Sequence, residues 1–312
     1  MGFLGSLLDR SIVFSFDKTG FRRHAKRFVP SDLDVDLRGQ VCLVTGASSG
    51  LGVAVVRGLA ERGAEVRMLC RNVSKGEAVR AELPDAANVV VDRIDLSDFA
   101  SIRAFAESFP RDRVDVLVHN AGVLPDAQQT TADDLELTAA TNLVGPFLLT
   151  HCLWPKLRHG ARMVHVSSGG MYAEPLEVDA LLSPPAPFDG VRAYARTKRA
   201  QVVLTKLLDA RSPLRVSSMH PGWADTPGVA SSLPRFYALT KVILRTPEEG
   251  ADTIVWLAAS PAASAPKGQF FFDRQPQPIH LSSKTHTSSD EERRLWTTLC
   301  ALVGADPEKD FR

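Results

Sequence analysis

The sequence predicts an α/β protein built on a single doubly wound parallel sheet with helices on both faces. Two observations support this fold class. Short apolar segments alternate along the chain with longer segments of helical periodicity, an alternation typical of a parallel sheet. The first apolar segment also runs into a glycine-rich turn, TGASSGLG (45–52), at the place where such folds bind a dinucleotide.

The first 38 residues are predicted to be an N-terminal extension, and residues 39–312 to be a dinucleotide-binding domain that includes the substrate loops. In the extension, Leu4, Leu8, Ile12 and Phe16 recur every four residues, which indicates an amphipathic helix. Five basic residues follow it: Lys18, Arg22, Arg23, Lys26 and Arg27. This pattern suits weak contact of residues 1–27 with an anionic membrane surface. Packing against the chain's own domain or a partner subunit explains it equally well.

Composition excludes several other classes of protein. The chain of 312 residues is 44% hydrophobic and 23% charged, with a net charge of +1, so nothing draws it to nucleic acid. The four cysteines form no CxxC pair and the eight histidines show no metal-binding spacing, so no metal site is expected. No apolar run reaches the ~18 residues needed to span a bilayer. We expect a cytoplasmic protein, with peripheral membrane contact as an alternative.

Seven segments are predicted as strands, and the stretches between them carry helical periodicity. The strands are expected at 41–45, 65–70, 88–94, 114–119, 162–167, 214–219 and 268–272. The first helix is expected to end at Gly63, since glycine is favoured just past a helix end. Ser289 and Glu292 have the spacing of a capping box for a closing helix. The apolar face of that helix comprises Leu295, Trp296, Leu299 and Val303.

The glycine-rich turn carries the first candidate site. Gly46, Gly50 and Gly52 stand between a strand and a helix, where glycine lets the backbone approach a pyrophosphate at the helix N-terminus. Ser48, Ser49 and Leu51 between them are expected to line the same cofactor site.

A second candidate is the pair Tyr194 and Lys198, which stand four residues apart in a predicted helix and therefore on one face of it. A nearby ammonium favours the phenolate, so the pKa of Tyr194 is expected to fall from about 10 towards neutrality. The tyrosine would then serve as a proton donor and acceptor near physiological pH.

Taken in order, these motifs resemble the short-chain dehydrogenase/reductase family over roughly residues 39–275. TGxxxGxG is followed by HNAG (119–122), Asn142, Ser168, YxxxK at Tyr194 and Lys198, and then Pro221, Gly222 and Thr226. One subgroup of the family is resembled most closely, through the segments FVPSDLDV (28–35), SSGGM (167–171), PFDG (187–190), KRAQVVLT (198–205), MHPGWADTPGV (219–229) and GADTIVWLA (250–258).

The resemblance implies a catalytic set and a cofactor set. It implies that Tyr194 donates the proton to a carbonyl oxygen, that Ser168 hydrogen-bonds this oxygen, and that Lys198 tunes Tyr194 and holds the nicotinamide ribose. Asn142 would position a water that connects Lys198 to solvent. Further cofactor contacts are implied at Asp95, Leu96, Asn120, Ala121, Gly122, Pro221, Gly222 and Thr226. His119 stands where the family usually has asparagine, and its simplest interpretation is a strand end in a polar niche.

The choice between NADP(H) and NAD(H) depends on the end of the second strand, EVRMLC (65–70). An acidic residue there favours NAD by accepting from the ribose hydroxyls. Cys70 and Arg71 stand there instead. Arg71 can pair with a 2′-phosphate, so NADP(H) is preferred over NAD(H). The alternative for Arg71 is a solvated surface charge.

The substrate is less well defined by the sequence. Residues 171–190 carry four prolines and are expected to form an ordered cover. Residues 227–245 are rich in apolar side chains, which suits a lipophilic carbonyl or alcohol substrate. The same residues could instead form the interface of a homo-oligomer or contact a membrane. Two other functions are less favoured. The spacing of Gly46, Gly50 and Gly52 argues against an epimerase or dehydratase, and the complete catalytic set argues against a catalytically idle NADP-binding sensor or interaction protein.

Overall fold

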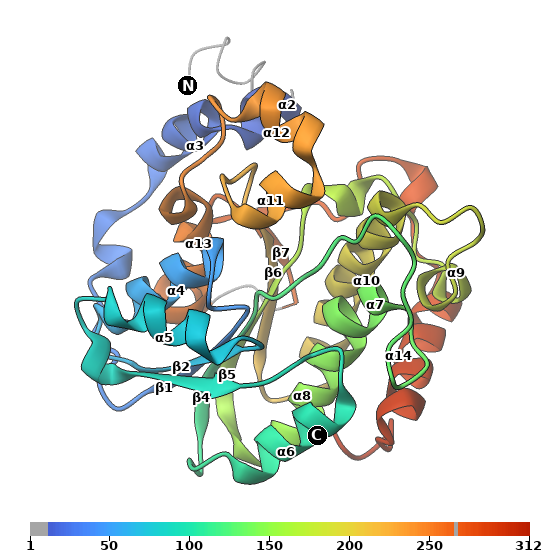
Figure 1. Cartoon of the computed structure of the whole chain (residues 1–312), viewed down its shortest axis with the longest axis horizontal. Coiled ribbons are helices and arrows are strands. Elements are labelled where there is room, and N and C mark those ends of the chain that lie inside the picture. The colour runs from blue at the N-terminus through green and yellow to red at the C-terminus, as the bar shows by residue number, and fades with distance from the viewer. Residues whose placement is uncertain (1–11, 265–267) are drawn as a thin grey trace.

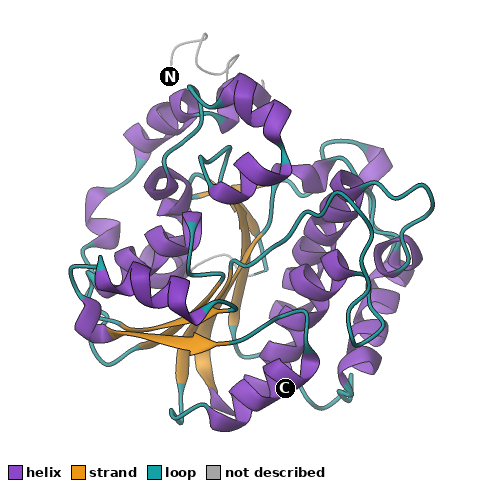
Figure 2. Ribbon diagram, viewed as in Figure 1, coloured by secondary structure: helices purple, strands orange, loops and turns teal. Residues whose placement is uncertain are grey.

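The structure is a computed structural model of the chain, and it describes residues 12–264 and 268–312. The described residues form one eight-stranded sheet in the order β3-β2-β1-β4-β5-β6-β7-β8, parallel except for the last strand (Figures 1 and 2). The strands are β1 Val41–Thr45, β2 Glu65–Cys70, β3 Val89–Arg93, β4 Val114–His119, β5 Leu157–Val166, β6 Arg215–His220, β7 Phe270–Phe272 and β8 Gln275–Gln277. This order confirms the predicted doubly wound sheet.

Helices cover both faces of the sheet, which is why strands such as β1 and β4 are buried along their whole length. One apolar core lies between the sheet and α6, α8, α10 and α14, and a second lies between the sheet and α4 and α13. The larger helices are α4 Gly50–Ala60, α5 Val73–Ala81, α6 Phe99–Ser108, α8 Gly145–Leu153, α10 Gly190–Arg211, α13 Pro247–Ala259 and α14 Ser289–Val303. The shorter ones are α2 Ile12–Phe16, α3 Lys18–His24, α7 Leu137–Ala139, α9 Val178–Leu182, α11 Pro227–Ser232 and α12 Pro234–Thr240.

The seven predicted strands are all present, with ends that differ by a few residues. Strand β8 was not predicted, because it pairs with β7 through a two-residue turn at Asp273 and Arg274 rather than through a glycine turn. The predicted capping box at Ser289 is wrong by one residue. Ser288 is the N-cap of α14, and its side chain accepts a hydrogen bond from the Glu291 backbone amide. The apolar face of α14 is buried, as expected.

The N-terminal segment packs on the domain rather than extending as one helix. Leu4 and Leu8 of the predicted apolar stripe lie outside the described residues. Helix α2 ends at Phe16, and the Asp17 side chain accepts from the Gly20 backbone amide to begin α3. Both helices lie beside α12 at one end of the molecule (Figure 1). Of the alternatives for the described part of this segment, the structure shows packing against the chain's own domain. Among the described residues no helix is both long and apolar enough to cross a bilayer.

Candidate active site

A cleft of about 500 Å³ lies at the carboxyl ends of the central strands, where doubly wound folds bind their ligands. It brings together most of the predicted cofactor residues, namely Gly46, Ser48, Ser49, Gly50, Leu51, Arg71, Asp95, Leu96, Asn120, Ala121, Gly122 and Thr226. Residues that the sequence analysis missed also line it, among them Asn72, Lys75, Ile94, Val123, Thr141 and Gly228. Five residues that the sequence also predicted as cofactor contacts are not among those that line this cleft: Gly52, Tyr194, Lys198, Pro221 and Gly222.

The glycines of the turn are required by close approaches of the backbone. Gly46 has φ +64°, and a Cβ there would lie 2.8 Å from the Ala121 Cα. A Cβ on Gly52 would lie 2.3 Å from the Gly46 oxygen. Because Gly52 has no side chain, the turn at Gly46 can pack directly against it. The N-terminus of α4, at Gly50 and Leu51, faces the cleft. The Ser49 side chain caps no backbone amide of that helix. This geometry suits a bound phosphate.

Two cations stand at the end of the cleft formed by β2 and α5. Arg71 follows β2 and Lys75 lies in the first turn of α5, and both are exposed and line the cleft. No acidic residue follows β2 before Asn72, whose side chain caps α5. The cleft therefore offers positive charge where an NAD-binding site would offer a carboxylate. Lys75 could have been predicted from its place one helical turn beyond Arg71.

The catalytic candidates meet where α10 passes the end of β5. The Ser168 side chain lies beside the Tyr194 hydroxyl and acts to lower the pKa of this phenol. The Lys198 Nζ lies 5.3 Å from the centroid of the Tyr194 ring and donates to the Val166 oxygen over 2.8 Å. A Cβ on Gly122 would lie 3.5 Å from this Nζ. The group is thus continuous with the end of the cleft.

The pKa values differ from the expectation for the tyrosine. Desolvation raises the pKa of Tyr194 above its ordinary value, although part of the residue stays exposed. The neighbouring Ser168 side chain lowers the pKa, but by less than desolvation raises it. Burial lowers the pKa of Lys198 to about 7. The expected fall in the Tyr194 pKa is therefore not found, because the desolvation of the phenol outweighs the favourable effect of its neighbours.

Asn142 lies in a turn of π-helix, η4 (Ala140–Val144), a rare geometry that often occurs at functional sites. Its side chain bonds both main-chain groups of Val123 and the Thr197 hydroxyl. Its main-chain oxygen accepts from Gln201 Nε2 over 2.6 Å, and Gln201 Oε1 accepts from Lys198 Nζ over 3.2 Å. The buried Gln201 amide therefore links Asn142 and Lys198 directly, which the sequence analysis missed.

The predicted segment after β6 has a structural part and a cleft part. Gly222 has φ +76°, and a Cβ there would lie 2.3 Å from the Arg245 Nε, so this glycine makes room for a buried guanidinium. Thr226 caps α11 and lies against Gly50 on the cleft.

At the end of β4, the Asn120 side-chain amide donates a hydrogen bond to the Thr45 main-chain oxygen and so holds the glycine turn. His119 is buried and bonds the Thr150 hydroxyl, which confirms the polar-niche interpretation.

The comparison with known families agrees with this geometry. A family model for short chain dehydrogenases matches residues 40–235. The chain belongs to the short-chain dehydrogenase/reductase family. Members of this family are oxidoreductases that use NAD(P)(H), and the residues around the cleft fit such a cofactor.

Individual relatives narrow the subgroup. Human dehydrogenase/reductase SDR family member 12 is 42% identical over 303 residues, covering 92% of this chain and 96% of the relative. This confirms the subgroup indicated by the sequence segments. Human retinol dehydrogenase 11 is 35% identical over 282 residues, covering 86% of this chain and 87% of the relative.

Solved structures of the family share the fold. A crystal structure of a protein from Mycobacterium paratuberculosis has a TM-score of 0.71 at 28% identity, covering 87% of this chain and 96% of its own. A Beutenbergia cavernae structure with bound NADP has a TM-score of 0.60 at 26% identity, covering 75% of this chain and 95% of its own.

Proposed function

We propose that this oxidoreductase is NADP(H)-dependent and interconverts a carbonyl and an alcohol on a lipophilic small molecule, with Tyr194 as acid/base. The observation that carries the proposal is the position of the buried Lys198, whose Nζ lies 5.3 Å from the centroid of the Tyr194 ring at the end of the cleft, with Ser168 beside the phenol. Asn142 and Gln201 complete a continuous polar chain behind that lysine.

In the reductive direction the Tyr194 hydroxyl gives its proton to the carbonyl oxygen of the substrate. The nicotinamide, when bound, supplies the hydride to the carbonyl carbon. The Ser168 oxygen accepts from the Gly170 amide over 3.2 Å, so its own proton is available to the substrate oxygen. The charged form of Lys198, which burial restricts to pH values below about 7, stabilises the phenolate that forms, since an ammonium close to the ring favours the charged state of the phenol.

The preference for NADP(H) rests on Arg71 and Lys75. Both can pair with a 2′-phosphate, and an arginine can do so through two parallel hydrogen bonds. The remaining cofactor contacts of this proposal are those that the cleft collects, with Tyr194 and Lys198 at the nicotinamide end. The NADP bound in one related structure is consistent with this choice.

The lipophilic substrate class rests on the loop after β6. Phe236 lies in α12 with its ring 5.1 Å from the Trp223 ring, and Leu239 beside it is largely exposed. An apolar, aromatic surface next to the proposed site would suit an apolar organic group. The retinol dehydrogenases among the relatives carry in their name an alcohol of this kind.

Turnover tests the proposal. The protein is mixed with NADPH and a panel of lipophilic aldehydes and ketones, and the loss of NADPH absorbance is followed. Oxidation of NADPH that depends on the carbonyl supports the proposal. Tight binding of NADPH without turnover of any panel member would favour the alternative, an idle NADP-binding sensor.

A further inference from the structure

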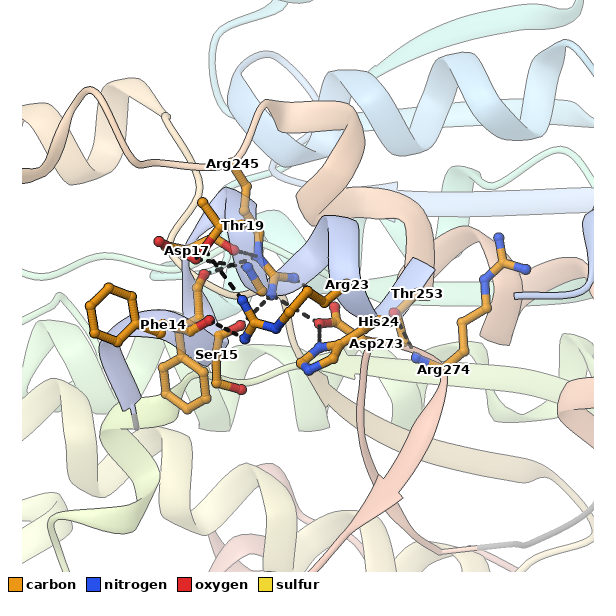
Figure 3. A network of polar contacts seen from close by, with 12 residues as sticks. Phe14, Ser15, Asp17, Thr19, Arg23, His24, Arg245, Thr253, Asp273 and Arg274 are labelled. Carbon is orange, nitrogen blue, oxygen red and sulfur yellow. Dashed lines mark hydrogen bonds and ion pairs between the residues drawn. The ribbon is translucent and has the colours of Figure 1, made fainter. Parts of the chain in front are cut away.

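The N-terminal segment is held against the domain by a buried arginine. Arg245 is 1% exposed, and its guanidinium donates to the main-chain oxygens of Ser15 and Phe16 over 3.0 and 2.9 Å (Figure 3). The same guanidinium bonds both carboxylate oxygens of Asp273, over 2.6 and 2.9 Å. His24, at the end of α3, lies 2.6 Å from the Asp273 carboxylate. Within the described residues, the segment is therefore held at Ser15 and Phe16 and again at His24.

Backbone pairing adds to this attachment. The Trp223 amide donates to the Phe16 oxygen over 2.8 Å, and the Lys18 amide donates to the Ile243 oxygen over 2.9 Å. Residues 16–18 thus lie between the beginning and the end of the loop that the proposed function assigns to the substrate. Such pairing fixes the direction of the Phe16 side chain.

The Phe16 ring lies against the residue that follows the catalytic serine. A Cβ on Gly169 would lie 2.7 Å from the Phe16 Cε2, so only glycine leaves room for the ring. The ring also packs edge-on against the His220 ring, with 4.3 Å between centroids, and against Phe272 at 5.1 Å. Phe16 therefore packs on Gly169, which directly follows Ser168 in the sequence, and Ser168 in turn lies beside Tyr194.

Phe16 continues an aromatic surface that leads away from the serine. Its ring lies 6.2 Å from that of Trp223, which in turn lies 5.1 Å from that of Phe236 in α12. Phe16, Trp223 and Phe236 all keep part of their side chains exposed. Three partly exposed rings in a row therefore form an apolar surface that begins at Gly169, next to Ser168.

We propose that the N-terminal segment completes the substrate site, and that Phe16 contacts the apolar part of the substrate and sets selectivity for its size. This inference rests on the proposed function, because it takes Ser168 as the group that binds the substrate oxygen. It assigns a role in specificity to a segment that precedes the dinucleotide-binding domain.

The test compares kcat/KM along a series of straight-chain aldehydes from four to twelve carbons, for the parent protein and Phe16→Ala. Removing the ring should change the ratio between long and short substrates by about 10-fold, while the NADPH dissociation constant stays within about twofold. Phe16→Trp, which enlarges the ring, should disfavour the longest members. Phe14→Ala is the matched control, because Phe14 is 48% exposed in the same segment and should leave the series unchanged.

The outcomes separate this inference from the proposed function. A loss by the same factor for every aldehyde, or no change in either Phe16 variant, overturns the assignment to Phe16 alone. Absence of turnover by the parent protein overturns the proposed function and this inference with it. Phe16→Leu keeps an apolar side chain in place, and its unfolding midpoint identifies any loss that comes from folding. An Ala variant that fails to fold leaves Leu and Trp to give the same comparison.

Discussion

The Gln201 side chain bonds the Asn142 main-chain oxygen through Nε2, over 2.6 Å, and at its other end accepts from the buried Lys198 ammonium. Gln201 Oε1 is one of two acceptors of that ammonium, the other being the Val166 oxygen. Since burial lowers the pKa of Lys198 to about 7, small changes in its surroundings alter its charge near neutral pH.

Gln201→Leu should lower the pKa of Lys198 further, because a buried ammonium that loses an acceptor is less stable. Gln201→Glu should raise it, because a carboxylate favours the charged lysine. We expect the Leu variant to reduce turnover by about 10-fold, because leaving one buried hydrogen bond unmade costs a free energy of about that size. The pH profile of alcohol oxidation is the decisive measurement, and the two variants should shift it in opposite directions. Parallel shifts, or none, would leave Gln201 with only a structural role.

How far the sequence predicts this site can be judged from particular residues. Tyr194, Lys198 and Ser168 follow from motif order, and the structure brings them together. Gln201 was missed although its signal was present, since a polar residue three positions after Lys198 lies on the same buried face of α10. The rise in the Tyr194 pKa was not predictable, because it depends on what covers the phenol.

The fold, like the site, could be predicted from the sequence only in part. Fully buried parallel strands appear in the sequence as apolar runs, so their positions could be predicted. Strand β8 could not, because its turn uses Asp273 and Arg274 with positive φ in place of the usual Asn-Gly or Asp-Gly pair. The packing of the N-terminus depends on Arg245, more than 200 residues away, and no local pattern reports such a contact.

Tyr194→Phe should abolish most activity while cofactor binding survives. The substitution keeps the ring beside Lys198 and removes the hydroxyl that would donate the proton. General acid–base catalysis is worth ~10²–10⁴-fold, so single-turnover hydride transfer should slow by at least that order. Lys198→Ala should in addition weaken NADPH binding, which a fluorescence titration measures. Hydride transfer in Tyr194→Phe within a few-fold of the parent rate would show that the phenol is not the proton donor.

Arg71→Asp should reverse the cofactor preference. The substitution removes a cation that can pair with the 2′-phosphate and supplies the carboxylate that NAD-binding sites use. A charge-assisted contact worth about 1–3 kcal/mol predicts an affinity for NADPH that is weaker by about 5- to 150-fold. Isothermal titration with NADPH and NADH measures both constants. Arg80→Asp is the control, because Arg80 lies on α5 but pairs with Glu77 and is absent from the cleft. Equal affinities of the parent for the two cofactors would contradict the preference.

Contact of the N-terminal region with anionic membranes stays a prediction, and the structure sharpens its test. A chain that begins at Asp36 would lose the Arg245 contacts as well as the basic cluster, so truncation confuses two effects. Arg22→Glu with Lys26→Glu reverses two basic residues of this cluster, and the Arg22 side chain is 68% exposed. Co-sedimentation with phosphatidylserine vesicles should fall in this variant and in high salt. Equal sedimentation with neutral and anionic vesicles would contradict an electrostatic attachment.

Asp273→Asn should destabilise the protein, because it leaves the Arg245 guanidinium buried without its counter-charge. Breaking a buried ion pair by removing one partner costs ~3–5 kcal/mol, which urea unfolding can measure. Asparagine is the appropriate replacement because Asp273 has φ +47°, a conformation that asparagine tolerates. Asp36→Asn is the control, since Asp36 and Arg38 form an exposed pair that should contribute less than ~1 kcal/mol.

The pH dependence of unfolding distinguishes an ion pair at Asp273 from simple packing. Burial alone would raise the pKa of Asp273, but the hydrogen bond from His24 and the charge of Arg245 outweigh it, so the pKa is lowered. A carboxyl whose folded pKa is lowered stabilises the protein above its unfolded pKa, which is about 4. That stabilisation is lost as the pH falls below 4 through the folded value. The parent should therefore lose more stability than Asp273→Asn between pH 5 and 2, because the amide has no proton to take up. Unfolding curves that stay parallel over this range would show that the Asp273 charge contributes nothing to holding the N-terminal segment in place.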